Sequence, residues 1–169
     1  MSDLKTYYKE LPPWGRGVVG VGATLIAIIV AVKAYQFIKS KVDTADANRE
    51  VNSATDDLKT LMGNGTNPSF PNSQYEAWSN QLVQAFSGCG TDTGTILNVF
   101  QSLSNEADLL KLISTYGIRK YDKCLSWAYP FGGSSNNLSL SAALADELGQ
   151  SDLDKVNTIL LNKGMNYRF

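Results

Sequence analysis

The chain has 169 residues, two cysteines, no histidine and a formal net charge of -1. This length fits one ordinary domain. The lack of histidine excludes Ser-His-Asp and Cys-His catalytic sites, histidine-containing zinc sites and histidine-ligated haem. Two cysteines are too few for a four-cysteine zinc site or an ordinary iron–sulfur cluster.

The charges are distributed unevenly along the chain. Residues 1–41 hold six basic and two acidic side chains, a net charge of +4, whereas residues 42–169 hold nine basic and 14 acidic ones, a net charge of -5. Such a step predicts that the two segments occupy different environments. Because like charges repel, we expect the acidic part to bind no nucleic acid directly.

Residues 17–32 read GVVGVGATLIAIIVAV and contain no charge. The apolar run continues past Lys33, whose stem can lie in the membrane, so the pattern predicts a transmembrane helix within residues 15–41. The alternatives are a buried core helix and a cleaved signal peptide, although no small-x-small cleavage pattern follows the run. The flanking positive charges are balanced, which leaves the orientation open. The residues expected to anchor the chain are Trp14, Arg16, Val18, Val21, Leu25, Ile28, Ile29, Val32, Lys33 and Tyr35.

Small residues recur every three or four positions in the same segment. Such a stripe would let a second helix approach closely in the membrane, or it reflects only the abundance of small residues in membrane helices. The stripe consists of Gly17, Gly20, Ala23, Ala27 and Ala31. Residues 1–14, which precede it, are expected to form an N-terminal arm.

Residues 42–72 are predicted to be a helical stalk and linker that continues from the membrane helix. Apolar residues at a three-four spacing give this helix one narrow stripe. The stripe is about two heptads long, which is short for a coiled coil, and the other interpretation is packing onto the chain's own C-terminal domain. The stripe residues are Ala47, Val51, Ala54, Leu58 and Leu61.

Residues 73–169 are predicted to be an all-α head domain of five short helices. A capping box at Ser73 and Glu76 marks the first helix start, and glycines mark the helix ends. A further helical turn is expected at 118–128, and the stretch YPFGGSSNN at 129–137 is expected to be a loop. The predicted N-caps of the later helices are Thr91, Ser104 and Ser151.

The order of motifs in residues 73–163 resembles a single annexin-type repeat. An amphipathic helix is followed by the glycine loop G-x-G-T-D at 88–92, then by a Ser-Asn turn at 104–105 and a Leu-rich helix that ends in DELG at 146–149. The resemblance implies a compact five-helix domain. It departs from the family in having one repeat, an insertion before the fourth helix, and Thr93 where an acidic residue usually follows.

In annexins the glycine loop binds calcium through backbone carbonyls, and a later acidic side chain completes the site. The resemblance therefore implies calcium ligands at the carbonyls of Phe86, Gly88 and Gly90 and at the carboxylate of Glu147, which suits an ion that prefers several oxygen ligands. The other interpretation is a tight turn between helices with Glu147 on the surface. No other cofactor is expected.

The two cysteines, Cys89 and Cys124, stand 35 positions apart. They could pair if the helices between them fold back. We expect free buried thiols, because buried cysteine is common and assembly inside a cell is reducing.

The layout of a membrane helix, an annexin-like domain and the tail LLNKGMNYRF is similar to proteins of bacteriophages that infect Bacteroidetes, whose tailless icosahedral members carry an internal membrane. This resemblance implies a non-enzymatic virion protein in that membrane, and in the host inner membrane before assembly. The head would link the membrane to capsid or other minor proteins, from the capsid side. Aromatic contact candidates are Tyr129, Phe131, Tyr167 and Phe169, with local packing as the alternative.

Two other functions stay open. One is a cellular single-pass membrane-tethered binding module that uses the glycine loop on calcium and phospholipid. The other is a small peptidoglycan hydrolase, which needs only two carboxylates. No carboxylate pair in the sequence stands in an apolar context that would raise one pKa, so no catalytic residue is assigned.

Overall fold

The computed structural model describes residues 45–122 and 137–169. By its internal contacts the chain divides into two units, residues 1–41 and residues 42–169. The predicted arm and membrane segment lie outside the described residues, as do Cys124, Tyr129 and Phe131. In the described part of the chain, no helix combines the length and the apolar character needed to cross a bilayer.

The described residues are mostly helical, so the predicted all-α class is confirmed at that level. The first helix covers residues 45–63. The other elements are α3 (Asn72–Phe86), α4 (Thr93–Ser102), α5 (Glu106–Tyr116), β1 (Arg119–Lys120), β2 (Asn137–Leu138), α6 (Leu140–Glu147) and α7 (Gln150–Asn162).

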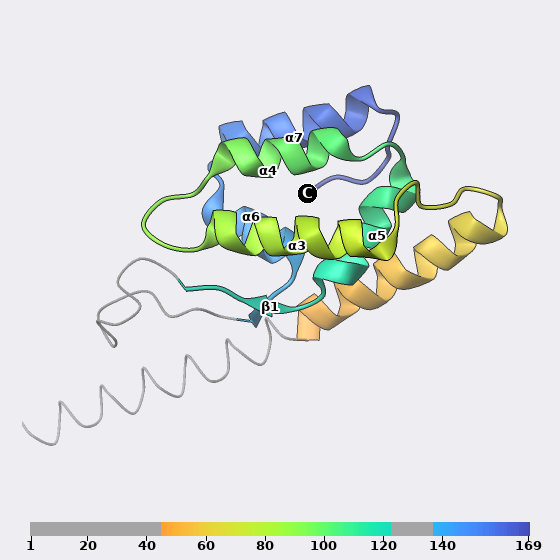
Figure 1. The fold of residues 1–169 in the computed structure, drawn as a ribbon, viewed down its shortest axis with the longest axis horizontal. Helices are drawn as coiled ribbons and strands as arrows, with labels where there is room; N and C mark the ends of the chain where they lie inside the picture. The colour runs from red at the N-terminus through yellow and green to blue at the C-terminus, as the bar shows by residue number, and fades with distance from the viewer. Residues whose placement is uncertain (1–44, 123–136) are drawn as a thin grey trace, which may run out of the picture. The chain divides into compact units, whose positions relative to one another are not determined.

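The helices of the head share one apolar core. Helix α3 packs on α4 and α5, and α4 also packs on α7, so α4 lies between α3 and α7 (Figure 1). The three-four spacing of apolar residues in the sequence produces this packing, because it places them on one face of each helix. The largest fully buried side chains are Tyr75, Tyr116, Phe86, Phe100, Leu82, Ile96, Leu103, Leu109, Leu112, Ile113, Leu140 and Leu144.

The 45–63 helix belongs to this same core. Ala54 and Leu58 are buried in the core cluster, which confirms the interpretation that the apolar stripe packs on the chain's own domain. A carboxylate oxygen of Glu50 accepts hydrogen bonds from the backbone N–H of Ser141 at 3.2 Å and from its hydroxyl at 2.7 Å. Since Ser139, the N-cap of α6, provides no side-chain cap, Glu50 caps α6 from a distant part of the chain.

Four predicted helix starts are wrong by one or two residues. Asp92 caps α4 instead of Thr91, since its carboxylate accepts a hydrogen bond from the backbone N–H of Thr95 at 3.0 Å. Asn105 caps α5 instead of Ser104 through the backbone N–H of Asp108 at 2.9 Å. The other misplaced starts are those of α3, which follows Pro71 without a side-chain cap, and α7, which follows Gly149.

The chain after α5 forms a short strand instead of the predicted helical turn. Gly117 ends α5 with φ +60°, as its position in the sequence indicated. Arg119 then pairs with Leu138, and Lys120 with Asn137, in an antiparallel ladder. The pairing partner lies well downstream in the sequence, and local sequence patterns do not reveal it.

A buried carboxylate fixes the start of α5. Asp108 is fully buried and accepts hydrogen bonds from the backbone N–H groups of Ser69 at 2.6 Å and Ser104 at 2.8 Å. The hydroxyl of Tyr75 donates to it at 2.6 Å. One side chain therefore joins the connection before α3, the helix α3 and the first turn of α5, where the helix dipole favours a negative charge.

The C-terminal residues fold back onto the core. Phe169 exchanges two hydrogen bonds with the Asn157 side chain, at 2.9 and 3.0 Å, and its ring lies 5.5 Å from that of Phe100. Tyr167 also packs on the core. Both side chains are partly buried, as the local-packing alternative expects, and their contact with a partner protein stays a prediction.

Candidate functional site

The loop between α3 and α4 carries the first candidate site. Gly88 and Gly90 have φ values of +97° and +123°. This backbone conformation is accessible to glycine and strained for other residues. The G-x-G spacing therefore has a local reason, because the chain must reverse between two adjacent antiparallel helices within a few residues.

The fold brings Glu147 to this loop. The hydroxyl of Thr91 donates to the carboxylate of Glu147 at 2.9 Å and lies 3.3 Å from its backbone carbonyl. Glu147 is the last residue of α6, so the contact joins the start of α4 to the end of α6. The glycine loop and Glu147 thus lie together at one corner of the head, and Phe86, the last residue of α3, is buried.

The chain after α5 closes the same corner from the other side. The backbone N–H of Gly88 donates to the carbonyl of Asp122 at 2.7 Å. The hydroxyl of Tyr121 donates to Asp146 at 2.9 Å, and its ring centroid lies 5.6 Å from that of Phe86. Burial, and then the hydrogen bond to Asp146, raise the pKa of Tyr121, so this phenol stays protonated as a donor.

The chemistry of the corner limits which ion it could hold. Among the described residues, no group of three or more Cys, Asp or Glu side chains is placed to bind a metal. An ion here would need backbone carbonyls from the loop together with Glu147, which is a calcium-type ligand set. Asp92 is engaged elsewhere, since the backbone N–H and the hydroxyl of Thr95 hold the pKa of its carboxyl below the usual value and fix it as the cap of α4.

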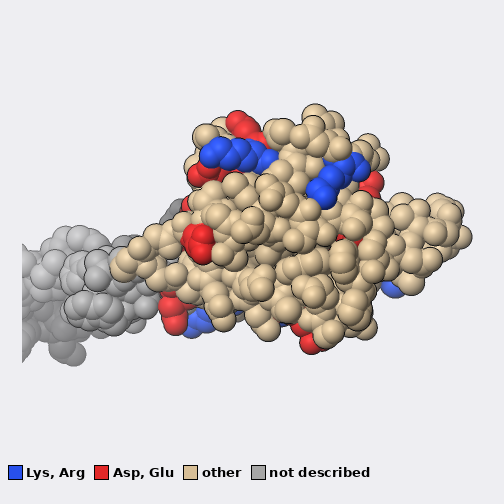
Figure 2. All heavy atoms as spheres, turned by 45° about the horizontal axis from the view of Figure 1, so that its top comes forward, with Lys and Arg blue, Asp and Glu red and all other residues tan. Residues whose placement is uncertain are grey.

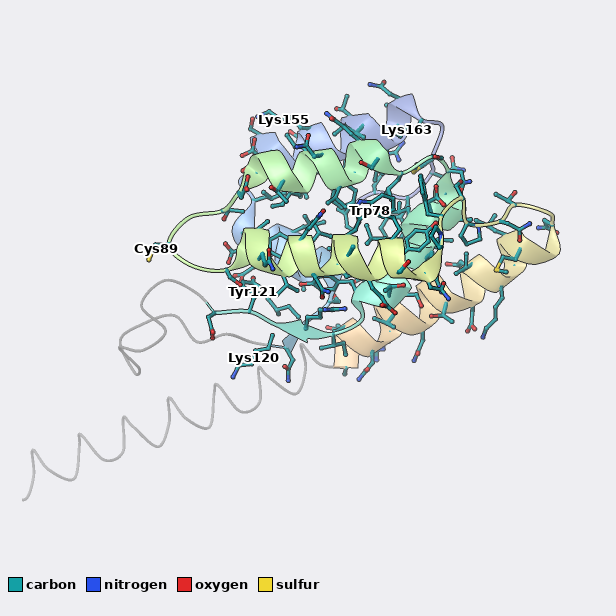
Figure 3. All side chains as sticks on the ribbon, viewed as in Figure 1. Trp78, Cys89, Lys120, Tyr121, Lys155 and Lys163 are labelled. Carbon is teal, nitrogen blue, oxygen red and sulfur yellow. The ribbon has the colours of Figure 1, made fainter. Side chains whose placement is uncertain are left out.

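Cys89 lies at the tip of the loop (Figure 3) and is disulfide-bonded. The expectation of free thiols is therefore wrong. The sequence contains one other cysteine, Cys124, which is not among the described residues. A separation of 35 positions in the sequence does not determine how far apart two residues lie in the fold. The structure shows that the loop between α3 and α4 contacts the chain just after β1, through the hydrogen bond from Gly88 to Asp122.

A second candidate site is a groove between α3 and α4 that the sequence reasoning missed. Its volume is about 400 Å³. Helix α4 contains no charged residue and α3 contains only Glu76, and the middle of the face seen in Figure 2 carries few charged atoms. The near-absence of charged residues from the sequences of α3 and α4 is the feature that could have indicated this groove. The groove is lined by Gln81, Gln84, Ala85, Asp92, Thr95 and Asn98.

The predicted membrane-anchoring residues and the small-residue stripe all lie between positions 14 and 35, outside the described ranges. Comparisons with protein-family models, curated proteins and solved structures find no match. The resemblances to an annexin repeat and to phage proteins therefore rest on the sequence motifs given above.

Proposed function

We propose that this protein is a minor structural component of a virion, anchored in an internal viral membrane by residues 15–41. Its head domain links that membrane to capsid or other minor proteins. Before assembly the protein resides in the host inner membrane. The proposed role is mechanical and requires no catalytic centre.

The observation that carries this proposal is the docking of the 45–63 helix. A link must transmit force from its anchor to its contact surface. The chain that leaves the predicted anchor enters the head as a helix held by buried Ala54 and Leu58 and by the Glu50 bonds to Ser141. A second polar contact joins Thr55 and Ser114 at 3.0 Å. This helix supports the role because a load applied at residue 45 reaches the core directly.

The groove between α3 and α4, in which Asp92 is the one charged lining residue, is the contact surface that we assign to the protein partner. The cores of protein interfaces are depleted in Lys, Glu and Asp, because burying a charge costs more than burying an amide or a hydroxyl. Gln84 and Asn98 offer both donors and acceptors to a partner's polar groups. Most other exposed helix faces of the head carry charges, including the 45–63 helix and α7.

The test begins with purified particles from the source culture. Antibodies against the protein should detect it in gradient-purified virions, and detergent extraction of lipid should release it together with a partner protein. Absence of the protein from particles of constant composition would refute the virion role.

The anchor has its own test. The full-length protein expressed in bacteria should stay in the membrane after alkaline carbonate washing. Ile28→Lys should reduce that retention, because a charge at the bilayer centre costs about 3 kcal/mol. Asn48→Lys, on the exposed side of the 45–63 helix, is the matched control and should leave retention unchanged.

The alternative function is a membrane-tethered module that binds calcium and phospholipid. The contact between Thr91 and Glu147 favours it, since this contact places a carboxylate beside the glycine loop. Calorimetric titration of the full chain in detergent micelles with calcium should then give a binding isotherm that Glu147→Gln abolishes and Glu76→Gln does not. A titration without heat from the unmodified protein would reject this alternative.

A further inference from the structure

A second groove runs between α4 and α7 and combines apolar and charged side chains. Its volume is about 570 Å³, and α4 supplies Leu97 and Gln101 to it. Leu97 and, from α7, Ile159 are partly buried against the core and give the groove an apolar part. The other α7 residues that line it are all exposed, and they are Ser151, Asp154, Lys155 and Thr158.

The four exposed α7 residues form a pattern with two-fold symmetry. They lie on one face of the helix, because the last three follow Ser151 at distances of three, four and seven positions. When two copies of α7 cross antiparallel, with a two-fold axis between positions 154 and 155, Asp154 of each copy faces Lys155 of the other. Ser151 of each copy then faces Thr158 of the other. Every such contact joins an acid to a base or one hydroxyl to another, which is the self-complementarity that a two-fold interface needs.

The bonds within α7 are compatible with these contacts. The Nζ of Lys155 lies 2.6 Å from Asp152, its side chain is 57% exposed, and an ammonium group has three donors. Asp154 accepts a bond within the helix on Oδ1 at 2.8 Å, and its carboxylate has a second oxygen. The Thr158 hydroxyl donates to the backbone carbonyl of Asp154 at 2.8 Å, so its oxygen can accept from the Ser151 hydroxyl of a second copy.

The distribution of charge makes this groove more suitable for a second copy than the others that the described residues line. Residues 42–169 carry a net charge of -5, so two heads repel each other where acidic side chains meet. The α4–α7 groove is lined by one acidic and one basic residue, and the symmetric contact pairs them. A second copy in the α3–α4 groove would bring two Asp92 carboxylates to an interface without a basic lining residue. The pocket beside Tyr167 has the same disadvantage, since its charged lining residues are Asp57 and Glu106.

We propose that a second copy of this chain occupies the α4–α7 groove, with the two α7 helices antiparallel and Asp154 of each copy paired with Lys155 of the other. The apolar part of the groove supplies most of the affinity, because exposed ion pairs stabilise little by themselves. The charges fix the register and the direction of the crossing. A single helix crossing gives a small interface, so the dimer is weak and reversible.

This dimer is compatible with the proposed function and does not depend on it. The lining residues of the α3–α4 groove and of the α4–α7 groove do not overlap, so one head can bind a second copy and a different partner protein at once. The dimer forms whether or not the protein enters a virion.

The first experiment measures association of the full chain by sedimentation equilibrium in density-matched detergent micelles. The unmodified protein should show a reversible monomer–dimer equilibrium. Asp154→Lys and Lys155→Asp should each raise the dissociation constant by about tenfold, because the symmetry turns two attractive charge pairs into two repulsive ones. A chain that stays monomeric at the highest concentration reached would overturn the proposal. So would a dimer that both substitutions leave unchanged, which is the result expected for association through the predicted membrane helix.

The second experiment mixes the two variants. Each variant repels a copy of itself, but a basic copy opposite an acidic copy restores two attractive pairs. Asp154→Lys carrying one affinity tag should therefore capture Lys155→Asp carrying another, about as well as the unmodified chain captures itself. The double variant Asp154→Lys with Lys155→Asp should also dimerise, because it exchanges the charges and keeps their pairing. A loss of folding cannot produce these recoveries, and failure of either one would refute the proposed pairing.

Asp56→Lys on the 45–63 helix is the matched control. Its side chain is 74% exposed and pairs with Lys59 three positions later, as Asp152 does with Lys155. This variant should leave the dissociation constant unchanged. If it weakens the dimer as much as Asp154→Lys does, the net charge of the head controls association and the α7 contact is wrong. None of these measurements uses particles, so absence of the protein from virions would refute the virion role and leave the dimer intact.

Discussion

Asp108 is the single side chain on which most of the local order around α5 depends. A buried carboxylate is stabilising only when hydrogen bonds replace the water it loses. Here two backbone N–H groups and the Tyr75 hydroxyl do so at 2.6–2.8 Å. Removing the charge would leave these donors facing a weaker acceptor.

We expect Asp108→Asn to lower the free energy of unfolding by about 3 kcal/mol, since hydrogen bonds to charged groups are worth about 1.5–3 kcal/mol. Urea unfolding of the full chain in detergent micelles, followed by far-ultraviolet circular dichroism, measures this. Asp154→Asn, on the exposed face of α7, is the control and should change stability by less than about 0.5 kcal/mol. Equal effects of the two substitutions would contradict the structural role of Asp108.

Gly117 occupies a backbone conformation that other residues adopt only under strain. Its φ of +60° and ψ of -132° lie in a region that is essentially restricted to glycine. We expect Gly117→Ala to destabilise the head by about 1–3 kcal/mol. Gly149→Ala should be neutral or slightly stabilising, because Gly149 has a φ of -71° and open space around its Cα. Thermal unfolding of the two variants side by side decides between these outcomes.

The buried tyrosines make the stability of the head decrease at alkaline pH. Burial raises the pKa of Tyr75 and Tyr121 in the folded state above the ordinary value of 10.0, and their hydrogen bonds to Asp108 and Asp146 add to the effect. The unfolded chain therefore releases these protons first, so their contribution to stability is complete below about pH 10 and decreases above it. We expect urea midpoints to be constant from about pH 8 to about pH 9 and to fall above about pH 10.

Tyr121→Phe provides the comparison for this pH dependence. It should lower stability at neutral pH by about 1 kcal/mol through loss of the bond to Asp146, and its midpoint should fall less steeply above pH 10. A variant with the same alkaline slope as the unmodified protein would show that Tyr121 does not contribute to it.

At the scale of elements, the cap that Glu50 provides to α6 connects two parts of the chain 91 positions apart. A cap of this kind is worth about 1 kcal/mol. We expect Glu50→Ala to increase amide hydrogen exchange at the first turn of α6 and along the 45–63 helix, with smaller changes in α3. Asp57→Ala, on the same helix, removes a carboxylate that accepts from the Ser53 hydroxyl, and it should leave the exchange at α6 unchanged.

The positions of the helices were largely predictable from sequence, and their ends were less so. Stripes such as Leu109, Leu112 and Ile113 define a buried face by spacing alone, because the helix period is fixed. The caps were misplaced where two capping residues stand side by side, as with Thr91 and Asp92. The choice there depends on Glu147, which engages the Thr91 hydroxyl from α6.

The candidate site was predictable only in part, for a similar reason. The motif order indicated that the glycine loop and Glu147 belong together, and the fold places them in contact. The disulfide state of Cys89 and the strand pairing of Arg119 depend on partners many positions away. Local patterns carry no information about such contacts, because periodicity and capping describe only near neighbours along the chain.

At the scale of the whole chain, the disulfide should contribute measurably to stability. A bond between the two cysteines closes a loop of about 35 residues, and closing such a loop in the unfolded chain is worth about 3–4 kcal/mol. We expect a reductant to lower the thermal midpoint of the full chain. It should leave the midpoint of Cys89→Ser unchanged, and a shift of equal size in Cys89→Ser would mean that the reductant acts elsewhere.

The Glu50 contact with Ser141 also sets the order in which the protein can be completed during synthesis. The 45–63 helix leaves the ribosome early, but the residue that its carboxylate caps is made 91 positions later. Until then, α6 is missing from the core cluster in which Ala54 and Leu58 are buried. Helices α3, α4 and α5 can associate first through contacts between near neighbours in sequence, which form fastest. The newborn chain therefore passes through a stage in which the apolar stripe of the 45–63 helix is incompletely covered. Binding to a chaperone or to the membrane surface would keep that stripe away from water at this stage.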